Sequence, residues 1–162
     1  MNEKAVLTNS ADLSQPSEEV ERLAHEVVGA ALEVHRALGP GFLEPVYEEA
    51  MCVELGLRNI PYTYEETVEV DYKGHKVGGG RLDLRVGRDL VVELKAVATL
   101  LPIHTAQLLS YLKATGCVLG LLINFNTVVL RDGIKRVILS KIRPIAFIAS
   151  SRLNEYHGYE PQ

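Results

Sequence analysis

Residues 79–97 read GGRLDLRVGRDLVVELKAV, and the prediction of the fold begins with them. Two segments of strand length, at about 79–86 and 90–97, lie in a region where apolar and polar residues alternate, and a glycine, an arginine and an aspartate separate them. A connection of three residues rich in turn formers is typical of a β-hairpin. We therefore predict a hairpin in which Val86 pairs with Leu90.

This hairpin is expected to bring Asp83 and Glu93 together. If Val86 pairs with Leu90, Asp83 lies directly opposite Glu93, with Cβ atoms about 4.5–5.5 Å apart; a connection of even length would instead turn Asp83 to the other face. Two carboxylates at this distance repel each other, and a hard cation such as Mg²⁺ or Mn²⁺ relieves the repulsion. Lys95 faces the same side as Glu93 and could hold or activate a water. The pattern predicts metal-assisted hydrolysis of a phosphodiester.

Helices and further strands are expected on both sides of the hairpin. Ser17 has the character of an N-cap that opens the first helix. The remaining predictions are a helix up to Leu38, a helix over about 44–55, a strand over 67–72, a helix that Pro102 opens and Gly116 ends, a buried strand over 117–123, and a final hairpin formed by 128–130 and 134–139. The fold class is α/β, in the order ααβββαβ plus this C-terminal hairpin. One domain over 17–150 is expected, between a flexible tail at 1–16 and a tail at 151–162.

The composition favours a soluble globular protein of the cytoplasm. The chain has 162 residues, of which 47% are hydrophobic and 23% charged, enough for a domain that buries its own core. No apolar run approaches the ~18–20 residues that span a bilayer, and the polar start of the sequence lacks the apolar core of a secretory signal. Cys52 and Cys117 show no CxxC spacing, so we expect free thiols in a reducing compartment.

The charge is distributed unevenly along the chain. The formal net charge is −4, but residues 1–66 carry 13 acids and 4 bases, whereas residues 67–162 carry 8 acids and 13 bases. The basic part permits a polyanionic partner such as nucleic acid without requiring one, since scattered bases are also typical of an ordinary solvated surface.

Three motifs together resemble those of a known nuclease family. Asp83, followed by Glu93-Leu94-Lys95, resembles the D…(D/E)xK signature of the PD-(D/E)XK nuclease superfamily. Gly41–Tyr47, which reads GFLEPVY, resembles the motif of the GxxExxY family, a branch of that superfamily. The segment QLLSYL, residues 107–112, follows at the next helix. The resemblance covers about residues 20–140.

The resemblance implies a mixed sheet flanked by helices and a site for Mg²⁺ or Mn²⁺. The implied metal ligands are Asp83, Glu93, the backbone carbonyl of Leu94 and Glu44; the implied catalytic residues are Lys95, Glu93, Asp83 and Gln107. One position departs from the signature, because Leu82 stands where its proline would precede the acid. The expected activity is a nuclease that acts on nucleic acid, with DNA favoured over RNA and a homodimer as a further expectation.

Other interpretations of these residues stay open at this point. Glu93 and Lys95 also suit an ion pair on an exposed strand, Glu44 suits an ordinary acid of a first helical turn, and Gln107 suits a surface amide. Two other functions also fit the motifs. One is a binding module for nucleic acid or protein that has a nuclease-like fold without cutting, and the other is a hydrolase of a different phosphate ester.

Overall fold

The computed structural model describes residues 15–140 and contains the predicted hairpin. The hairpin is formed by β2 (His75–Val86) and β3 (Leu90–Lys95), which run antiparallel. Val86 pairs with Leu90, so the predicted register is confirmed. The three residues between the strands form a tight turn, with Gly87 at a φ of 58°.

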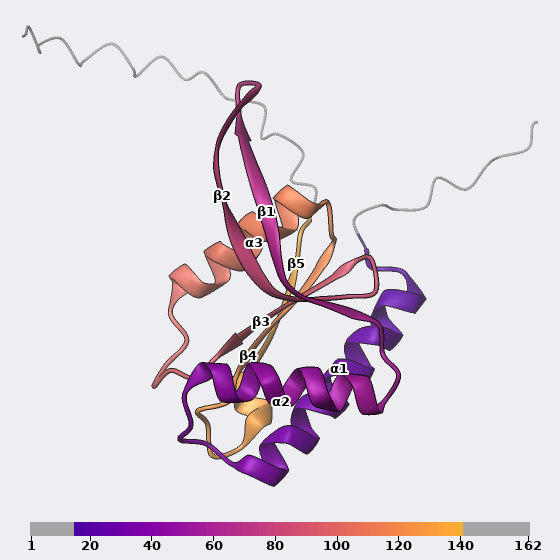
Figure 1. Cartoon of the computed structure of the whole chain (residues 1–162), viewed down its shortest axis with the longest axis vertical. Coiled ribbons are helices and arrows are strands. Elements are labelled where there is room, and N and C mark those ends of the chain that lie inside the picture. Colours follow the sequence, from indigo (N-terminus) through magenta and orange to yellow (C-terminus); the bar gives the residue numbers. More distant parts are fainter. Residues whose placement is uncertain (1–14, 141–162) are drawn as a thin grey trace, which may run out of the picture.

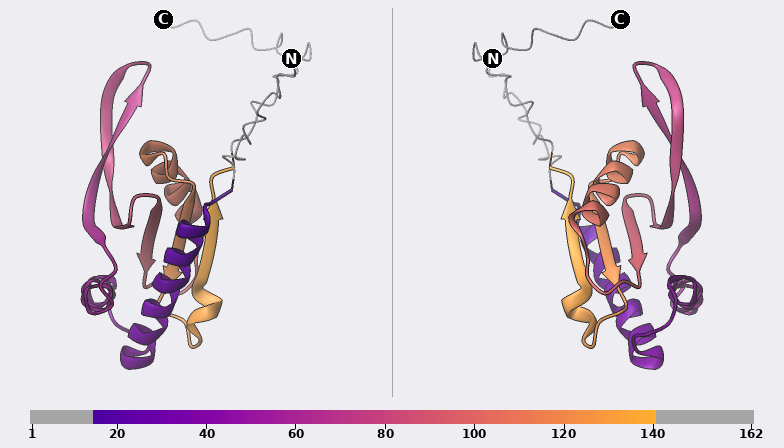
Figure 2. Two further views of the ribbon diagram at one scale, coloured as in Figure 1. Left: turned by 90° about the vertical axis from the view of Figure 1, so that its right-hand side faces the viewer. Right: turned by 90° about the vertical axis from the view of Figure 1, so that its left-hand side faces the viewer.

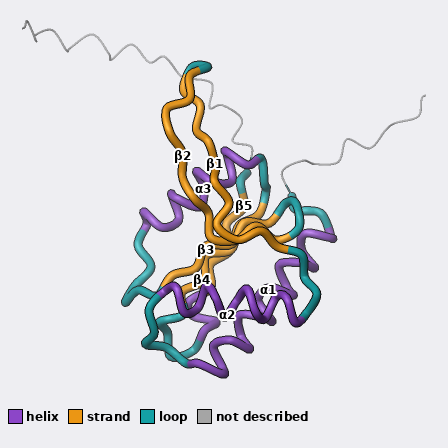
Figure 3. Tube along the Cα trace, viewed as in Figure 1, coloured by secondary structure: helices purple, strands orange, loops and turns teal. Residues whose placement is uncertain are grey.

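Five strands form one mixed sheet in the order β1-β2-β3-β4-β5 (Figures 1 and 3). β1 (Tyr62–Tyr72) pairs antiparallel with β2 at one edge. β4 (Leu119–Asn124) runs parallel to β3, and β5 (Ile134–Ile138) runs antiparallel to β4 at the other edge. All six residues of β4 are buried, as expected for a central strand covered on both faces.

The helices cover the sheet on both faces. α1 (Glu18–Leu38) and α2 (Glu44–Leu57) pack on the face that includes Val92, and α3 (Pro102–Thr115) packs on the face that includes Val91. The alternation along β3 therefore serves two cores, one for each layer of helices. Together with the sheet order, this confirms the predicted α/β class. Within residues 15–140, no helix has both the length and the apolar character needed to cross a bilayer.

β1 and β2 extend much further than predicted. They begin at Tyr62 and His75 and form a two-stranded arm that projects past the rest of the sheet (Figures 1 and 2). The register shifts where Val70 pairs with Gly78 and Asp71 pairs with Lys76, which leaves one extra residue on β2. This irregularity agrees with a bulge at the glycine run of β2.

The predicted C-terminal hairpin is wrong in its first strand. Residues 128–130 form no strand; a 3₁₀ turn, η1 (Leu130–Gly133), precedes β5, and β5 pairs with β4 instead. The reason is the partner available: β4 presents a long buried edge, whereas Val128 and Val129 are largely exposed. The predicted domain end at 150, the tail at 151–162 and nearly all of the tail at 1–16 fall outside the described residues.

Gly80 leaves room for the Tyr111 ring where α3 packs on β2. A Cβ at this position would lie 2.6 Å from Cε1 of Tyr111. Gly80→Ala should therefore lower the free energy of unfolding by about 1–3 kcal/mol, the usual cost of overpacking, as measured by urea denaturation. The same change in a Tyr111→Ala background should cost much less. An equal loss in both backgrounds would contradict this explanation; Gly56→Ala, which meets no atom within 4 Å, is the control.

Candidate metal centre

The two predicted acids lie where the β2–β3 ladder ends. Its last backbone pair is Leu84 with Val92, and Asp83 and Glu93 are the next residues along each strand. Their side chains replace the missing ladder bonds. The Asp83 N–H donates to Oε1 of Glu93 at 3.2 Å, and the Leu94 N–H donates to Oδ2 of Asp83 at 2.7 Å. The structure therefore brings the two acids together as the register predicted.

Lys95 lies among the carboxylates at the end of β3. Its Nζ donates to the Leu94 carbonyl at 2.8 Å and to Oε1 of Glu44 at 3.3 Å. Oε2 of Glu93 lies 3.9 Å from the same nitrogen. The Lys95 side chain is only 13% exposed and that of Glu93 only 2%, so these charges interact with little screening by water. The interpretation of Glu93 and Lys95 as an exposed ion pair is therefore wrong.

Glu44 reaches the hairpin because the loop before α2 is fixed. Gly39 and Gly41 have φ angles of 69° and 109°, which other residues rarely adopt. The hydroxyl of Tyr47 donates to the Gly39 carbonyl at 2.6 Å and accepts from the Phe42 N–H at 3.2 Å. The glycine and tyrosine of GFLEPVY thus hold the turn that starts α2 at Glu44, and the helix N-terminus favours an acid there.

Glu48 is a fourth acid that the sequence analysis did not single out. It follows Glu44 by one helical turn, and carboxylate oxygens of Glu44, Glu48 and Asp83 all lie within 4.8 Å of one another. The hydroxyl of Tyr64 on β1 donates to Oε2 of Glu48 at 2.8 Å. This hydrogen bond, together with burial, raises the pKa of Tyr64, which keeps the hydroxyl protonated as a donor. The sequence signal for Glu48 was its spacing of four residues from Glu44, which places both side chains on one face of a helix.

The environment shifts the pKa of each group at the hairpin end. Burial raises the pKa of Glu93 to about 8, and the Asp83 carboxylate adds to the rise. Burial also raises the pKa of Asp83 to about 6, against the Leu94 N–H and Lys95, which lower it. Burial lowers the pKa of Lys95, but the carboxylates of Asp83, Glu44 and Glu93 outweigh it, so the pKa is raised. The raised pKa values mean that the charged forms of Asp83 and Glu93 are destabilised here, and a bound cation would stabilise them.

The raised pKa of Glu93 should make the metal-free protein less stable at pH 8 than at pH 5. An unfolded glutamate has a pKa near 4.5, so between 4.5 and about 8 the folded chain holds the extra proton and stability falls as the pH rises. At about 1.4 kcal/mol per pKa unit, the loss from pH 5 to pH 8 is on the order of 3 kcal/mol. Urea denaturation in EDTA measures this loss. Glu93→Gln should lose far less; an equal loss would contradict the assignment to Glu93.

Asn124 fixes the backbone of the segment that follows β3. It is a buried polar residue at the end of β4, and it lies beside Lys95 in the parallel register. Its Oδ1 accepts from the Val97 N–H at 3.0 Å, and its Nδ2 donates to the Val97 carbonyl at 2.8 Å. The side chain thus continues the pairing of the sheet past Lys95. A polar residue that ends a continuous apolar run was the signal in the sequence.

Gln107 is not brought into the acidic cluster. It is exposed on α3, and its Nε2 donates to the hydroxyl of Tyr111 at 3.2 Å. That hydroxyl in turn donates to the Arg81 carbonyl at 3.0 Å. Within residues 15–140, no hydrogen bond or ion pair joins Gln107 to the four acids. The hydrogen bond of Gln107 thus lies within α3, and Tyr111 makes the bond that joins α3 to β2.

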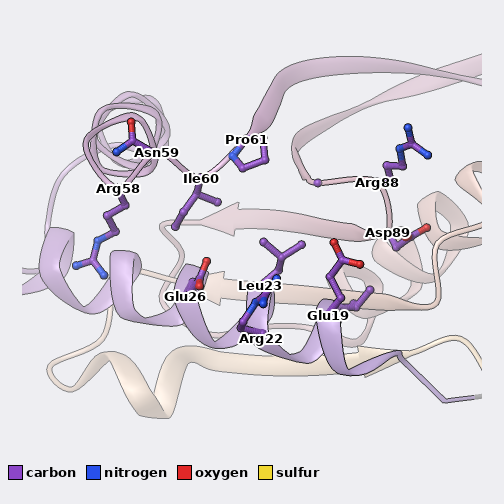
Figure 4. Close-up of a pocket in the computed structure, with 12 residues that line it drawn as sticks. Glu19, Arg22, Leu23, Glu26, Arg58, Asn59, Ile60, Pro61, Arg88 and Asp89 are labelled. Carbon is purple, nitrogen blue, oxygen red and sulfur yellow. The ribbon is translucent and has the colours of Figure 1, made fainter.

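A hollow of about 710 Å³ lies elsewhere, between α1, the α2–β1 connection and the β2–β3 turn (Figure 4). It contains none of the predicted site residues. Its charged lining is balanced between the bases Arg22, Arg58 and Arg88 and the acids Glu19, Glu26 and Asp89. Because it adjoins the turn of the hairpin while the acids lie at the far end of β3, it is separate from the candidate metal centre.

The sequence also matches a known family over most of its length. A model of the PD-(D/E)XK nuclease superfamily matches residues 21–137. The chain belongs to the PD-(D/E)XK nuclease superfamily. A search of curated proteins found no match. Among solved structures, this superfamily member is similar to the crystal structure of an alkaline exonuclease from Laribacter hongkongensis, with 13% sequence identity, 79% of this chain and 73% of that chain covered, and a TM-score of 0.43.

The donor set of this PD-(D/E)XK chain fits a divalent cation. Carboxylate oxygens are the ligands that Mg²⁺ and Mn²⁺ prefer, and three of the four acids lie within reach of one ion. Within residues 15–140, Lys95 is the base that contacts this group. Its single positive charge does not neutralise the acids, so a net negative charge remains. A divalent cation would remove most of that excess.

Proposed function

We propose that this chain is a divalent-metal-dependent nuclease that hydrolyses phosphodiester bonds of DNA or RNA. The observation that carries the proposal is the group of carboxylates from α2, β2 and β3 around Lys95, on residues that resemble the superfamily signature. A half-buried acidic group with one lysine is costly to keep unless it binds something positive. A bound metal cation would neutralise the carboxylates, and the scissile phosphate would pair with Lys95.

The proposed metal ligands are Asp83, Glu93, the Leu94 carbonyl and Glu44. A bound Mg²⁺ or Mn²⁺ would stabilise charge that develops on the phosphate and make a coordinated water more acidic. The Leu94 carbonyl accepts from Lys95 in this structure, and its second lone pair remains available for an ion. Asp83 stays oriented for the ion because its other oxygen is held by the Leu94 N–H.

Lys95 is proposed to position the attacking water and to offset phosphate charge. Its pKa is raised by the surrounding carboxylates, which favours the ammonium form and a role as hydrogen-bond donor over one as proton acceptor. Gln107 stays a prediction as a catalytic residue, since its contacts in the structure lie with Tyr111.

We further propose membership of the GxxExxY branch and a cytoplasmic location. The branch is supported by the local roles of Gly41, Glu44 and Tyr47, which together place the acid at the start of α2. The location is supported by Cys52 and Cys117, which are both free thiols. DNA as the favoured substrate and a homodimer stay predictions; substrate preference in cleavage and light scattering test them.

A cleavage assay tests the proposed function. Labelled single- and double-stranded DNA and RNA are incubated with the protein and with its Glu93→Gln variant, in Mg²⁺, Mn²⁺ or EDTA. We expect cutting that requires the metal and is lost in the variant. The preferred strand type then identifies the substrate class.

The competing function is a binding module for nucleic acid or protein that has a nuclease-like fold and does not cut. The acidic first half of the chain favours a protein partner for such a module, because duplex binding usually presents a clear basic face. If its partner is nucleic acid, such a module should shift the mobility of nucleic acid in a gel and should cleave it with none of the metals. Cleavage of a small phosphodiester with no action on any nucleic acid would instead indicate the hydrolase of another phosphate ester.

A further inference from the structure

Glu48 lies where it can act with the proposed metal ligands. It shares a face of α2 with Glu44, one turn away, and its carboxylate lies within 4.8 Å of those of Glu44 and Asp83. Its side chain is half-buried, so the repulsion among the three acids is only partly screened. This position belongs to neither of the motifs that contain the proposed ligands.

Among residues 15–140, no base forms an ion pair with Glu48. Lys95 contacts Glu44 and Glu93, and it forms no ion pair with Glu48. Within residues 15–140, the hydrogen bond that the Glu48 carboxylate accepts comes from Tyr64, a neutral donor. An acid beside two other acids, oriented by a neutral donor rather than neutralised by a base, is suited to a cation that arrives from solution.

Tyr64, which is 39% exposed, gives that acid a hydrogen-bond partner. It comes from β1, one of the two edge strands, and its hydroxyl donates to Oε2 of Glu48 at 2.8 Å. A glutamate loses up to about 2 kcal/mol of side-chain entropy when it is ordered, and a fixed donor offsets part of this cost before the ligand arrives. The bond also ties the base of the β1–β2 arm to α2.

We infer that Glu48 contributes to holding the divalent cation and that Tyr64 is the residue that positions Glu48. This inference rests on the proposed function, since it assigns two further residues to the same metal site. Removing a hydrogen bond to a side chain that ligates a metal typically lowers the metal affinity by about 10–100-fold. Tyr64 acts through Glu48 and therefore should have no effect once Glu48 is changed.

Isothermal titration with Mn²⁺ alone, without nucleic acid, tests the inference. Tyr64→Phe should weaken Mn²⁺ binding by about 10-fold or more, and Glu48→Gln by at least as much. The double variant should bind no more weakly than Glu48→Gln, because the two effects share one route. Matched controls are Glu49→Gln, an exposed acid next to Glu48, and Tyr72→Phe, an exposed tyrosine of the same strand; both should bind as the wild type does.

The outcomes separate this inference from the proposed function. Wild-type affinity in both Tyr64→Phe and Glu48→Gln would overturn the inference while the metal site itself stands. Additive losses in the double variant would overturn the positioning role of Tyr64. A wild-type protein that binds no Mn²⁺ would overturn the proposed function together with the inference. Melting temperatures without metal are recorded for each variant, and Glu48→Gln tests the role of the acid if Tyr64→Phe is poorly folded.

Discussion

Lys95→Met should remove cleavage while the metal stays bound. Methionine has a similar reach and suits a side chain that is only 13% exposed, so the variant should fold. The cleavage rate should fall at least about 100-fold, since the variant lacks the donor that orients water and offsets phosphate charge. The Mn²⁺ affinity should equal or exceed that of the wild type, because the ammonium that occupies Glu44 and the Leu94 carbonyl is gone. Single-turnover cleavage and titration calorimetry measure the two effects.

The cleavage rate and the Mn²⁺ affinity together distinguish a catalytic role of Lys95 from a structural one. Lys113→Met, which removes an exposed base of α3, serves as the matched control and should cleave normally. A Lys95→Met variant that cleaves within a few-fold of the wild type would contradict a catalytic role. A variant that loses Mn²⁺ binding would assign Lys95 to the structure of the site instead of to its chemistry.

Glu93→Gln should lose both cleavage and tight metal binding, and its fold should remain. The amide oxygen of glutamine can still accept the Asp83 N–H, so the end of the hairpin keeps its hydrogen bond. The negative charge that would hold the ion is absent, and cleavage should fall at least about 100-fold. The rate in Mn²⁺ and the Mn²⁺-induced rise in melting temperature measure the loss.

Stability without metal separates this loss from unfolding. Because burial raises the pKa of Glu93 to about 8, removing its charge should make the metal-free variant at least as stable as the wild type at pH 8. Glu69→Gln, which changes an exposed acid on the arm, should leave cleavage and metal binding intact. Wild-type cleavage by Glu93→Gln would exclude Glu93 from the site.

Local rules were enough to predict the hairpin and its acids. A three-residue connection sets the pairing of Val86 with Leu90, and side chains then follow with a period of two, so the neighbourhood of Asp83 and Glu93 could be predicted without any long-range information. The same local reasoning failed at residues 128–130. Their β-branched residues suit a strand, but strand formation depends on an available partner edge, and β4 pairs with β5.

Turn length and side-chain periodicity act over a few residues, so they suffice to predict the α/β class, the register of the hairpin, and the acids and lysine at its end. The assembled fold ends the ladder at Leu84, which local rules did not predict, so that the two acids complete the pairing with their side chains. It also decided that Glu48 and Tyr64 join the site while Gln107 stays outside. The physical reason is that helical spacing shows which residues share a face, whereas the packing of α2, α3 and β1 on the sheet decides where that face points.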